Sequence, residues 1–458
     1  MEKRIAVFAL SEPNAIQAIL QLKKDRDIEI CAWLGVDKGQ GVINYDYGKL
    51  LDLDVQKSVA MPVPHEIYAK VYNHLLDFLN MVYRTGDLPI YKYINMFNLW
   101  LKFYYGLFTK QKINLLIFGD IPHFGVDSIA KDLADAMGIK TILFLQALEP
   151  NRFFAFTDIS DVGMFNTLSN SDILNLDVAE KFEKDLFYMK NLEVYTPSDS
   201  SRSDKKVFLR KIYNLVRKNP EQILAKSKKR IMQKVGSKIS RNIAESEYAL
   251  IIRRDTLKEG INMMEKFVYF PLHMQPEMTT SALGGIFCDQ ILAIERLREM
   301  LPDDWKIYVK ENPIQSYYMR DDLFFRRLQL ISNTYLLGRE VSTYDLIKNC
   351  QFVATITGTA GWEAISGGKC VLVFGLAWYR KLPGVFEYTD GVTVDDIMNY
   401  NIDHEEVVKK YNELMGHSYK GILECGYEED VAGYSDKKNN VYLYEAFCKI
   451  LDKVFVSK

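Results

Sequence analysis

The stretch Thr357-Gly358-Thr359-Ala360-Gly361-Trp362-Glu363-Ala364 lies between two apolar runs, Phe352–Ile356 and Val371–Phe374. This succession predicts a strand, a tight turn, a short helix and a second strand. Glycine lets the backbone approach a ligand closely, and a helix that begins there directs its free N–H groups at an anion. A tight turn that binds nothing is the alternative, because short glycine motifs are weak indicators.

The side chains of this stretch suit a nucleotide attached to a second group. Thr357 and Thr359 add hydroxyl donors to the turn. Glu363 falls in the first helical turns, where a carboxylate can accept hydrogen bonds from a ribose diol. We therefore expect the phosphate at the turn and the ribose at Glu363.

The size and composition of the chain set the class of protein. A chain of 458 residues is too long for one ordinary core, so two domains are expected. A net charge of −2 supplies no global field for nucleic acid. The six cysteines form no Cys-x-x-Cys pair and predict buried thiols. No signal-peptide core and no run of about eighteen apolar residues occurs, from which we expect a cytoplasmic protein.

Four regions follow from the patterns along the chain. Strands alternate with helices in residues 1–195, with aromatic-rich helices inserted at about 60–110, and alternate again in residues 261–395. Residues 396–458 have the pattern of terminal helices. The prediction is an α/β protein with two Rossmann-like domains facing across a cleft, in which ligands bind beyond the carboxyl ends of the strands.

Residues 196–260 are predicted to be a basic helical linker. Lys205–Arg241 holds about a dozen Lys and Arg against few acids, with apolar residues at helical spacing. A solvated linker is one interpretation. A surface that contacts anionic lipid of the inner membrane, or a polyanionic acceptor, is the other.

A loop with two titratable residues follows the predicted strand Phe267–Leu272. His273 and Glu277 lie in it, in the string Pro271-Leu272-His273-Met274-Gln275-Pro276-Glu277. A carboxylate there can act as nucleophile or base, and a His as proton carrier or phosphate donor. A proline-bounded loop with a capping Glu and a packed His is the alternative.

Polar residues also follow three other predicted strands. Lys310-Glu311-Asn312-Pro313 comes directly after Trp305–Val309, and a Lys at a strand end suits a phosphate unless it is merely solvated. In the first domain, Asp120 and Glu149 follow strands and are candidates for the acceptor side or for acid–base chemistry.

Three strings together resemble the bacterial capsule polysaccharide biosynthesis proteins, which include the Kdo transferases of capsule and lipopolysaccharide assembly. They are Phe270–Glu277, Tyr308–Pro313 and Thr357–Ala364, in this order and separation. The resemblance covers about residues 265–390, and residues 113–160 only loosely. It implies a two-domain GT-B glycosyltransferase that uses CMP-activated ulosonic acids and retains the anomeric configuration.

The resemblance also implies roles for single residues. Glu277 would be the nucleophile that forms a glycosyl-enzyme adduct. In the mechanism that we expect from the residues themselves, Glu149 or Asp120 deprotonates the acceptor hydroxyl. Lys310 and Asn312 would neutralise the leaving phosphate. Family members often have a His-Pro where this chain has Asn312-Pro313, and Asn cannot carry a proton, so His273 is the candidate for that role.

Two further readings of the site stay open: a UDP- or GDP-hexose transferase on the same fold, and a non-catalytic scaffold of a polysaccharide assembly complex. The expected partners are a nucleotide-sugar donor and a glycan or glycolipid acceptor, without nucleic acid. No resident cofactor or metal is expected, since a helix N-terminus and a Lys can serve the phosphate and no Asp-x-Asp follows a strand of the first domain.

Overall fold

The computed structural model of the 458-residue chain describes residues 2–35, 44–82, 89–182, 261–313, 322–338 and 341–456, with residues 243, 246, 248–252, 315 and 320. The predicted basic segment Lys205–Arg241 therefore lies outside the described residues, and its contact with lipid stays a prediction. The chain divides into two compact units. Unit 1 comprises Met1–Phe182, Gln275–Ala293 and Phe352–Lys458, and unit 2 comprises Glu183–Met274 and Ile294–Gln351.

The first sheet has seven strands in the order β13-β6-β5-β4-β1-β2-β3. Its parallel strands are β1 (Lys3–Phe8), β2 (Ile28–Leu34), β3 (Asn44–Tyr45), β4 (Leu115–Phe118) and β5 (Lys140–Gln146). Two strands run antiparallel to their neighbours, β6 (Arg152–Phe156) beside β5 and β13 (Tyr419–Lys420) beside β6. The predicted parallel sheet is thus extended at one edge by antiparallel strands, of which β13 comes from the C-terminal region.

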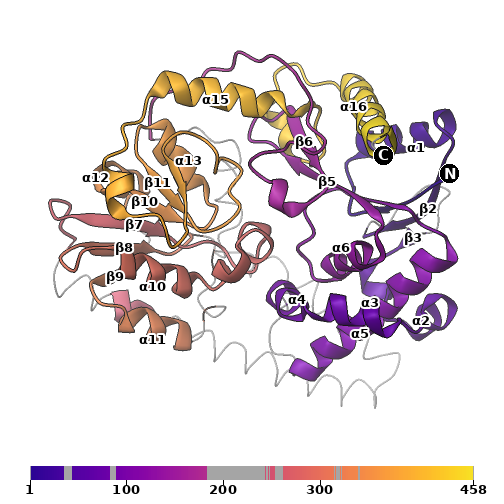
Figure 1. The fold of residues 1–458 in the computed structure, drawn as a ribbon, viewed down its shortest axis with the longest axis horizontal. Helices are drawn as coiled ribbons and strands as arrows, with labels where there is room; N and C mark the ends of the chain where they lie inside the picture. The colour runs from indigo at the N-terminus through magenta and orange to yellow at the C-terminus, as the bar shows by residue number, and fades with distance from the viewer. Residues whose placement is uncertain are drawn as a thin grey trace, which may run out of the picture. The chain divides into compact units, whose positions relative to one another are not determined.

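The core of this sheet is completed by helices from both ends of the chain. Helices α1 (Pro13–Asp25) and α16 (Asp436–Val456) lie side by side on the first sheet (Figure 1). Buried side chains of both helices form one apolar cluster with β1, β2 and β13. The C-terminal residues, predicted only as helices, therefore add a strand and a covering helix to the first sheet.

Four helices are inserted between β3 and β4. They are α2 (Leu53–Val59), α3 (His65–Tyr72), α4 (Leu75–Val82) and α5 (Ile90–Lys110). The aromatic-rich segment becomes this insertion because large rings fill the spaces between the helices. Phe78 of α4 packs edge-on against Phe97 and Trp100 of α5, with ring centroids 5.3 and 6.0 Å apart.

The second sheet has six strands in the order β12-β11-β10-β7-β8-β9. They are β7 (Phe267–Pro271), β8 (Lys306–Lys310), β9 (Thr334–Leu337), β10 (Val353–Thr355), β11 (Val371–Val373) and β12 (Val385–Glu387). The pairs β7–β8, β8–β9, β10–β11 and β11–β12 are parallel. The predicted α/β class with two Rossmann-like sheets is confirmed.

The helices that accompany these strands are α10 (Gln290–Met300), α11 (Asp322–Leu330), α12 (Thr343–Asn349), α13 (Thr359–Ser366), α14 (Val394–Met398) and α15 (His404–Gly416). A short π-helical turn, η5 (Met278–Ala282), and a 3-10 turn, η6 (Gly285–Cys288), follow β7. These turns occupy the loop in which the sequence placed Glu277. Helix α6 (Val126–Met137) follows β4 in the first sheet, and α13 is the short helix predicted after the Thr357 turn.

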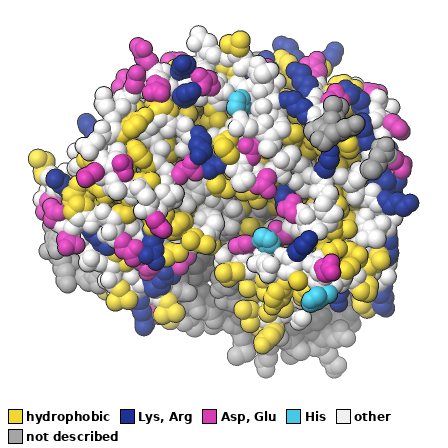
Figure 2. Space-filling view, viewed as in Figure 1, with side chains coloured by type: hydrophobic (Ala, Val, Ile, Leu, Met, Phe, Trp, Pro, Cys, Tyr) yellow, Lys and Arg dark blue, Asp and Glu magenta, His cyan; other side chains and the backbone are white. Residues whose placement is uncertain are grey.

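The surface and the cysteines complete this description. Lys, Arg, Asp and Glu side chains are interspersed on the face drawn in Figure 2, in keeping with a net charge of −2. Among the described residues, none of the helices is long and apolar enough to cross a membrane.

All six cysteines are free thiols, but Cys425 is exposed and Cys448 is half-buried. The expectation of six buried thiols is wrong at these two, which lie outside the packed strands.

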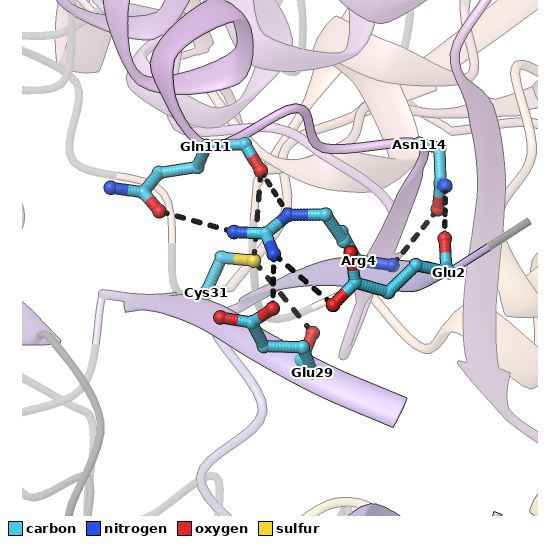
Figure 3. A network of polar contacts seen from close by, with 6 residues as sticks. All are labelled: Glu2, Arg4, Glu29, Cys31, Gln111 and Asn114. Atoms are coloured by element: carbon cyan, nitrogen blue, oxygen red, sulfur yellow. Dashed lines mark hydrogen bonds and ion pairs between the residues drawn. The ribbon is translucent and has the colours of Figure 1, made fainter. Parts of the chain in front are cut away.

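Arg4 joins three segments at the amino-terminal end of β1 (Figure 3). Its Nε donates to the carbonyl oxygen of Gln111, the residue that ends α5, and its Nη1 pairs with Glu29 of β2. A guanidinium at a helix C-terminus meets carbonyl groups that have no partner within the helix. Cys31 lies beside the same carbonyl, with its Sγ 3.9 Å from the Gln111 oxygen.

We expect Arg4→Met to lower the free energy of unfolding by about 1–3 kcal/mol, because two acceptors lose a charged donor at a site of which only 18% of the side chain is exposed. Urea unfolding measures this loss. Arg26→Met is the matched control, because Arg26 pairs with Asp452 at an exposed surface and should cost about 1 kcal/mol or less. Equal losses for the two variants would contradict the structural role of Arg4.

Candidate functional site

The turn after β10 has the geometry predicted for it. β10 ends at Thr355 and α13 begins at Thr359, with Gly358 at the N-cap. Gly358 brings no capping side chain, so no side chain of the cap occupies the first N–H groups of α13. A helix start of this kind presents N–H donors and the positive end of the helix dipole to an anion.

Gly361 is required by the close packing behind this turn. A Cβ atom at Gly361 would lie 2.1 Å from the hydroxyl of Tyr379. That hydroxyl donates to the carbonyl oxygen of Gly358. Gly361 thus leaves the space in which Tyr379 holds the N-cap residue of α13 in position.

The turn is hydrogen bonded to the segment that carries Glu277. Thr357 Oγ1 donates to the carbonyl oxygen of Thr279 at 2.7 Å. Glu277 is the N-cap of η5, and its Oε1 accepts a hydrogen bond from the Met278 amide at 3.1 Å. Two of the segments predicted from sequence to form the site are therefore in contact within unit 1.

Three carboxyl groups of unit 1 lie within electrostatic reach of one another: Asp120, Glu277 and Glu424. Burial raises the pKa of Asp120 to about 6, against an opposing effect of His123, and the charge of Glu277 adds to the rise. Burial likewise raises the pKa of Glu424 to about 7, with further contributions from Asp120 and Glu277. The Asp120 side chain is 42% exposed and Glu424 is exposed. Both carboxyl groups therefore reach solvent, although protein surrounds them closely.

The loop that carries Asp120 is held by the start of α6. Asp127 accepts hydrogen bonds from the amides of His123 and Phe124, at 3.3 and 2.8 Å. His123 Nδ1 lies 2.6 Å from the carbonyl oxygen of Ile121 and 4.0 Å from Asp120 Oδ2. Gly125, at a φ of 79°, allows the chain to turn from this loop into the helix. The backbone thus fixes Asp120 near the end of β4.

His273 and Glu311 belong to a buried network in unit 2. Arg320 donates to the carbonyl oxygen of His273 at 2.6 Å and forms a salt bridge with Glu311 at 3.0 Å, where both side chains are almost fully buried. Burial, followed by the charge of Arg320, lowers the pKa of His273 to about 3. The ring is therefore neutral at pH 7, and its predicted role as proton carrier stays a prediction. The carboxylate of Glu311 is engaged by Arg320.

The other predicted phosphate ligands lie at the end of β8. Lys310 is buried, and its Nζ donates to Thr343 Oγ1 at 2.9 Å, at the start of α12. The amide of Asn312 donates to Glu311 at 2.8 Å, and Pro313 is exposed. Their part in binding phosphate stays a prediction.

Glu149 contacts an aromatic side chain, and Glu363 is buried. Glu149 Oε1 accepts a hydrogen bond from the Tyr411 hydroxyl at 2.6 Å, and Tyr411 stacks on Trp362 of α13 at 5.0 Å. Glu363 is only 4% exposed, so its carboxylate offers little surface to a ribose. The bond to Tyr411 gives Glu149 a role in packing α15, while Asp120 lies with Glu277.

Sequence reasoning missed Glu424 and Arg320. Glu424 follows β13 in a segment predicted only as helix, and Arg320 lies between two strands with no spacing that marks it as a partner of Glu311. The acidic composition of Glu424–Asp430 is the one signal that the sequence offers for Glu424. Within the described part of the chain, no group of three His, Cys, Asp or Glu side chains is arranged to hold a metal ion.

We expect Gly361→Ala to destabilise unit 1 by about 1–3 kcal/mol, because the added methyl overlaps the Tyr379 hydroxyl. Thermal unfolding measures the loss. The double variant Gly361→Ala with Tyr379→Phe removes the hydroxyl that the methyl meets and should regain part of it. No recovery in the double variant would contradict the assigned contact.

We expect Glu424→Gln to stabilise the protein more at pH 8 than at pH 5. The folded protein holds this proton up to about pH 7, whereas the ordinary pKa is 4.5, so the folded state binds more protons between these values. Stability therefore falls as the pH rises through this window, and a neutral amide removes that loss. The difference in Tm between variant and parent at both pH values is the measurement. Glu405→Gln, at the exposed start of α15, is the reference for losing a surface carboxylate, and a pH-independent difference at Glu424 would contradict the assignment.

Known families and solved structures were compared with this chain. Residues 225–399 match the family model described as capsule polysaccharide biosynthesis protein. No curated protein matches the chain. Among solved structures, the chain is similar to the KpsC β-Kdo 2,7 transferase of Thermosulfurimonas dismutans, with 12% identity, 81% of this chain and 95% of that chain covered, and a TM-score of 0.32.

Two further solved structures are similar to this chain at comparably low identity and TM-score. The KpsC β-Kdo 2,4 transferase of Thermosulfurimonas dismutans has 11% identity, covers 68% of this chain and 82% of its own, and gives a TM-score of 0.29. The UDP-GlcNAc 2-epimerase of Methanocaldococcus jannaschii has 10% identity, covers 90% and 99%, and gives 0.26. TM-scores this low support no conclusion about activity. The family match includes all three motifs and confirms their resemblance to capsule polysaccharide biosynthesis proteins over residues 225–399.

Proposed function

We propose that this chain is a glycosyltransferase of capsule assembly that moves a sugar from a nucleotide donor to a glycan or glycolipid acceptor. One observation carries the proposal. The Thr357 hydrogen bond to Thr279 joins an anion-binding turn to the segment that begins with Glu277, inside the matched region. A leaving phosphate and a reacting carboxylate need to lie on opposite sides of the same sugar carbon, and two linked segments can provide this.

The donor phosphate is assigned to the turn at Thr357–Gly361. The N–H groups at the start of α13 and the threonine hydroxyls would stabilise the negative charge that develops as the nucleotide leaves. Lys310 and Asn312, at the end of β8 in unit 2, stay predicted phosphate ligands, and Glu363, which is buried in α13, stays a predicted ribose ligand. The family resemblance makes a CMP-activated ulosonic acid the first donor to test.

The sugar is assigned to the carboxyl groups of unit 1. Glu277 would attack the anomeric carbon and form the glycosyl-enzyme adduct, and the acceptor hydroxyl would then displace it with overall retention. With a pKa of about 6, Asp120 is largely ionised above neutral pH and can take the acceptor proton. Glu424, with a pKa of about 7, can exchange that proton with solvent.

Nucleotide binding and turnover of Glu277→Gln test this assignment together. CMP, UDP and GDP at millimolar concentration should raise the Tm of both the parent and the variant, most with the nucleotide of the donor, because ligand bound to the folded state stabilises it. Turnover of the matching nucleotide sugar should fall by about 10³-fold or more in the variant, since the nucleophile is gone.

Glu405→Gln, on the exposed face of α15, is the control and should keep its turnover. Near-normal turnover of Glu277→Gln would remove Glu277 as nucleophile. Stabilisation by UDP or GDP alone would favour a hexose transferase, and no stabilisation by any nucleotide would favour a non-catalytic scaffold, for which Asn312 in place of a His is the one favouring feature.

A further inference from the structure

The inserted helix α4 is bonded to the segment that carries Glu277. Asn80, near the end of α4, contacts this segment twice. Its carbonyl oxygen lies 3.3 Å from the Ser281 hydroxyl, which donates to it, and its side-chain Nδ2 donates to Cys288 Sγ at 3.1 Å. Ser281 and Cys288 are both buried. All of these residues belong to unit 1, although about two hundred positions of sequence separate them.

Each contact leads back to Glu277 through one more hydrogen bond. The Ser281 amide donates to the Glu277 carbonyl oxygen at 2.7 Å, so Ser281 is bonded to Glu277 and Asn80 at once. On the other side, the Cys288 carbonyl oxygen accepts from Gln275 Nε2 at 2.7 Å, two residues before Glu277. Asn80 therefore holds the segment on both sides of the carboxylate.

The segment itself is tightly folded, so a displacement at one point is passed along it. A Cβ atom at Gly284 would lie 2.4 Å from the Thr280 carbonyl oxygen. The Thr357 bond to Thr279 fixes the same turn from the α13 side. Interiors packed this closely transmit small shifts instead of absorbing them.

Helix α4 is a firm support for Asn80. Phe78, two residues earlier, is 1% exposed and lies between Phe97 and Trp100 of α5. Alanine is a better helix former than asparagine, so replacing Asn80 removes the contact with Cys288 without weakening α4 itself.

From these contacts we infer that Asn80 is a positioning residue for Glu277: the inserted helices set the place of the reacting carboxylate through Ser281 and Cys288. This rests on the proposed function only for its catalytic consequence. The hydrogen bonds themselves can be tested without substrate. Position matters because a shift of about 1 Å in a reacting group can cost about 100-fold in rate.

The experiment compares Asn80→Ala, Ser281→Ala and Cys288→Ala with Cys288→Ser, which keeps an acceptor for Asn80, and with Asn95→Ala, an exposed residue of α5. Hydrogen–deuterium exchange of peptides covering residues 277–288 is the first readout. The three alanine variants should exchange about tenfold faster there, and the other two should match the parent. Turnover of the nucleotide sugar that matches the stabilising nucleotide is the second readout.

We expect kcat of the alanine variants to fall about 10- to 100-fold with the donor KM within about twofold, because the carboxylate moves and the phosphate turn stays in place. The double variant Asn80→Ala with Cys288→Ala should be no slower than either single variant, since both remove one contact. Cys288→Ser should keep most of the parental kcat, which general unfolding would not explain.

The outcomes separate the two proposals. Unchanged exchange in Asn80→Ala and Ser281→Ala overturns the positioning role, whatever the activity of the protein. Faster exchange with unchanged kcat also overturns it, because the segment would then loosen without moving the carboxylate. A parent protein that turns over no nucleotide sugar instead overturns the proposed function, and with it the catalytic consequence for Asn80.

Discussion

The hydrogen bond from Thr357 to the Thr279 carbonyl oxygen is the interaction on which the site depends. It is 2.7 Å long and joins the turn before α13 to the π-helical turn that begins at Glu277. The turn alone is a helix start whose N–H groups suit an anion, and Glu277 alone is the carboxylate that caps η5. Because the bond fixes one against the other, a ligand phosphate at the turn would have a carboxylate at a set distance from it.

Electrostatics adds a second constraint to the same place. Asp120 and Glu424 both have raised pKa values because protein surrounds them closely, while their side chains keep access to solvent. Carboxyl groups held together in this way resist complete ionisation, so one can be charged while a neighbour holds a proton. A transfer reaction that needs a carboxylate and a proton acceptor side by side can use that difference.

Much of the fold follows from local sequence patterns, and the exceptions have a common cause. The apolar runs Phe267–Leu272, Trp305–Val309 and Val371–Phe374 form β7, β8 and β11, because period and end signals lie within each segment. β13 was not foreseen, since two residues paired to β6 leave no periodic pattern. Cys425, which follows β13 in a turn, is exposed, and such exposure depends on tertiary packing that the local sequence does not specify.

The residues of the candidate site likewise differ in whether local sequence patterns reveal them. Residues just after predicted strands, such as Asp120 and Glu277, could be found because parallel strands carry their functional groups at their carboxyl ends. Asn80 and Glu424 could not, because one lies within an inserted helix and the other in a tail that returns to the first sheet. A hydrogen bond from such a distant segment forms only when the intervening chain is ordered by the packing of a whole helix, so no local pattern reveals it. The sequence patterns thus locate the candidate groups, whereas the inserted and terminal elements that contact their loops become visible only in the fold.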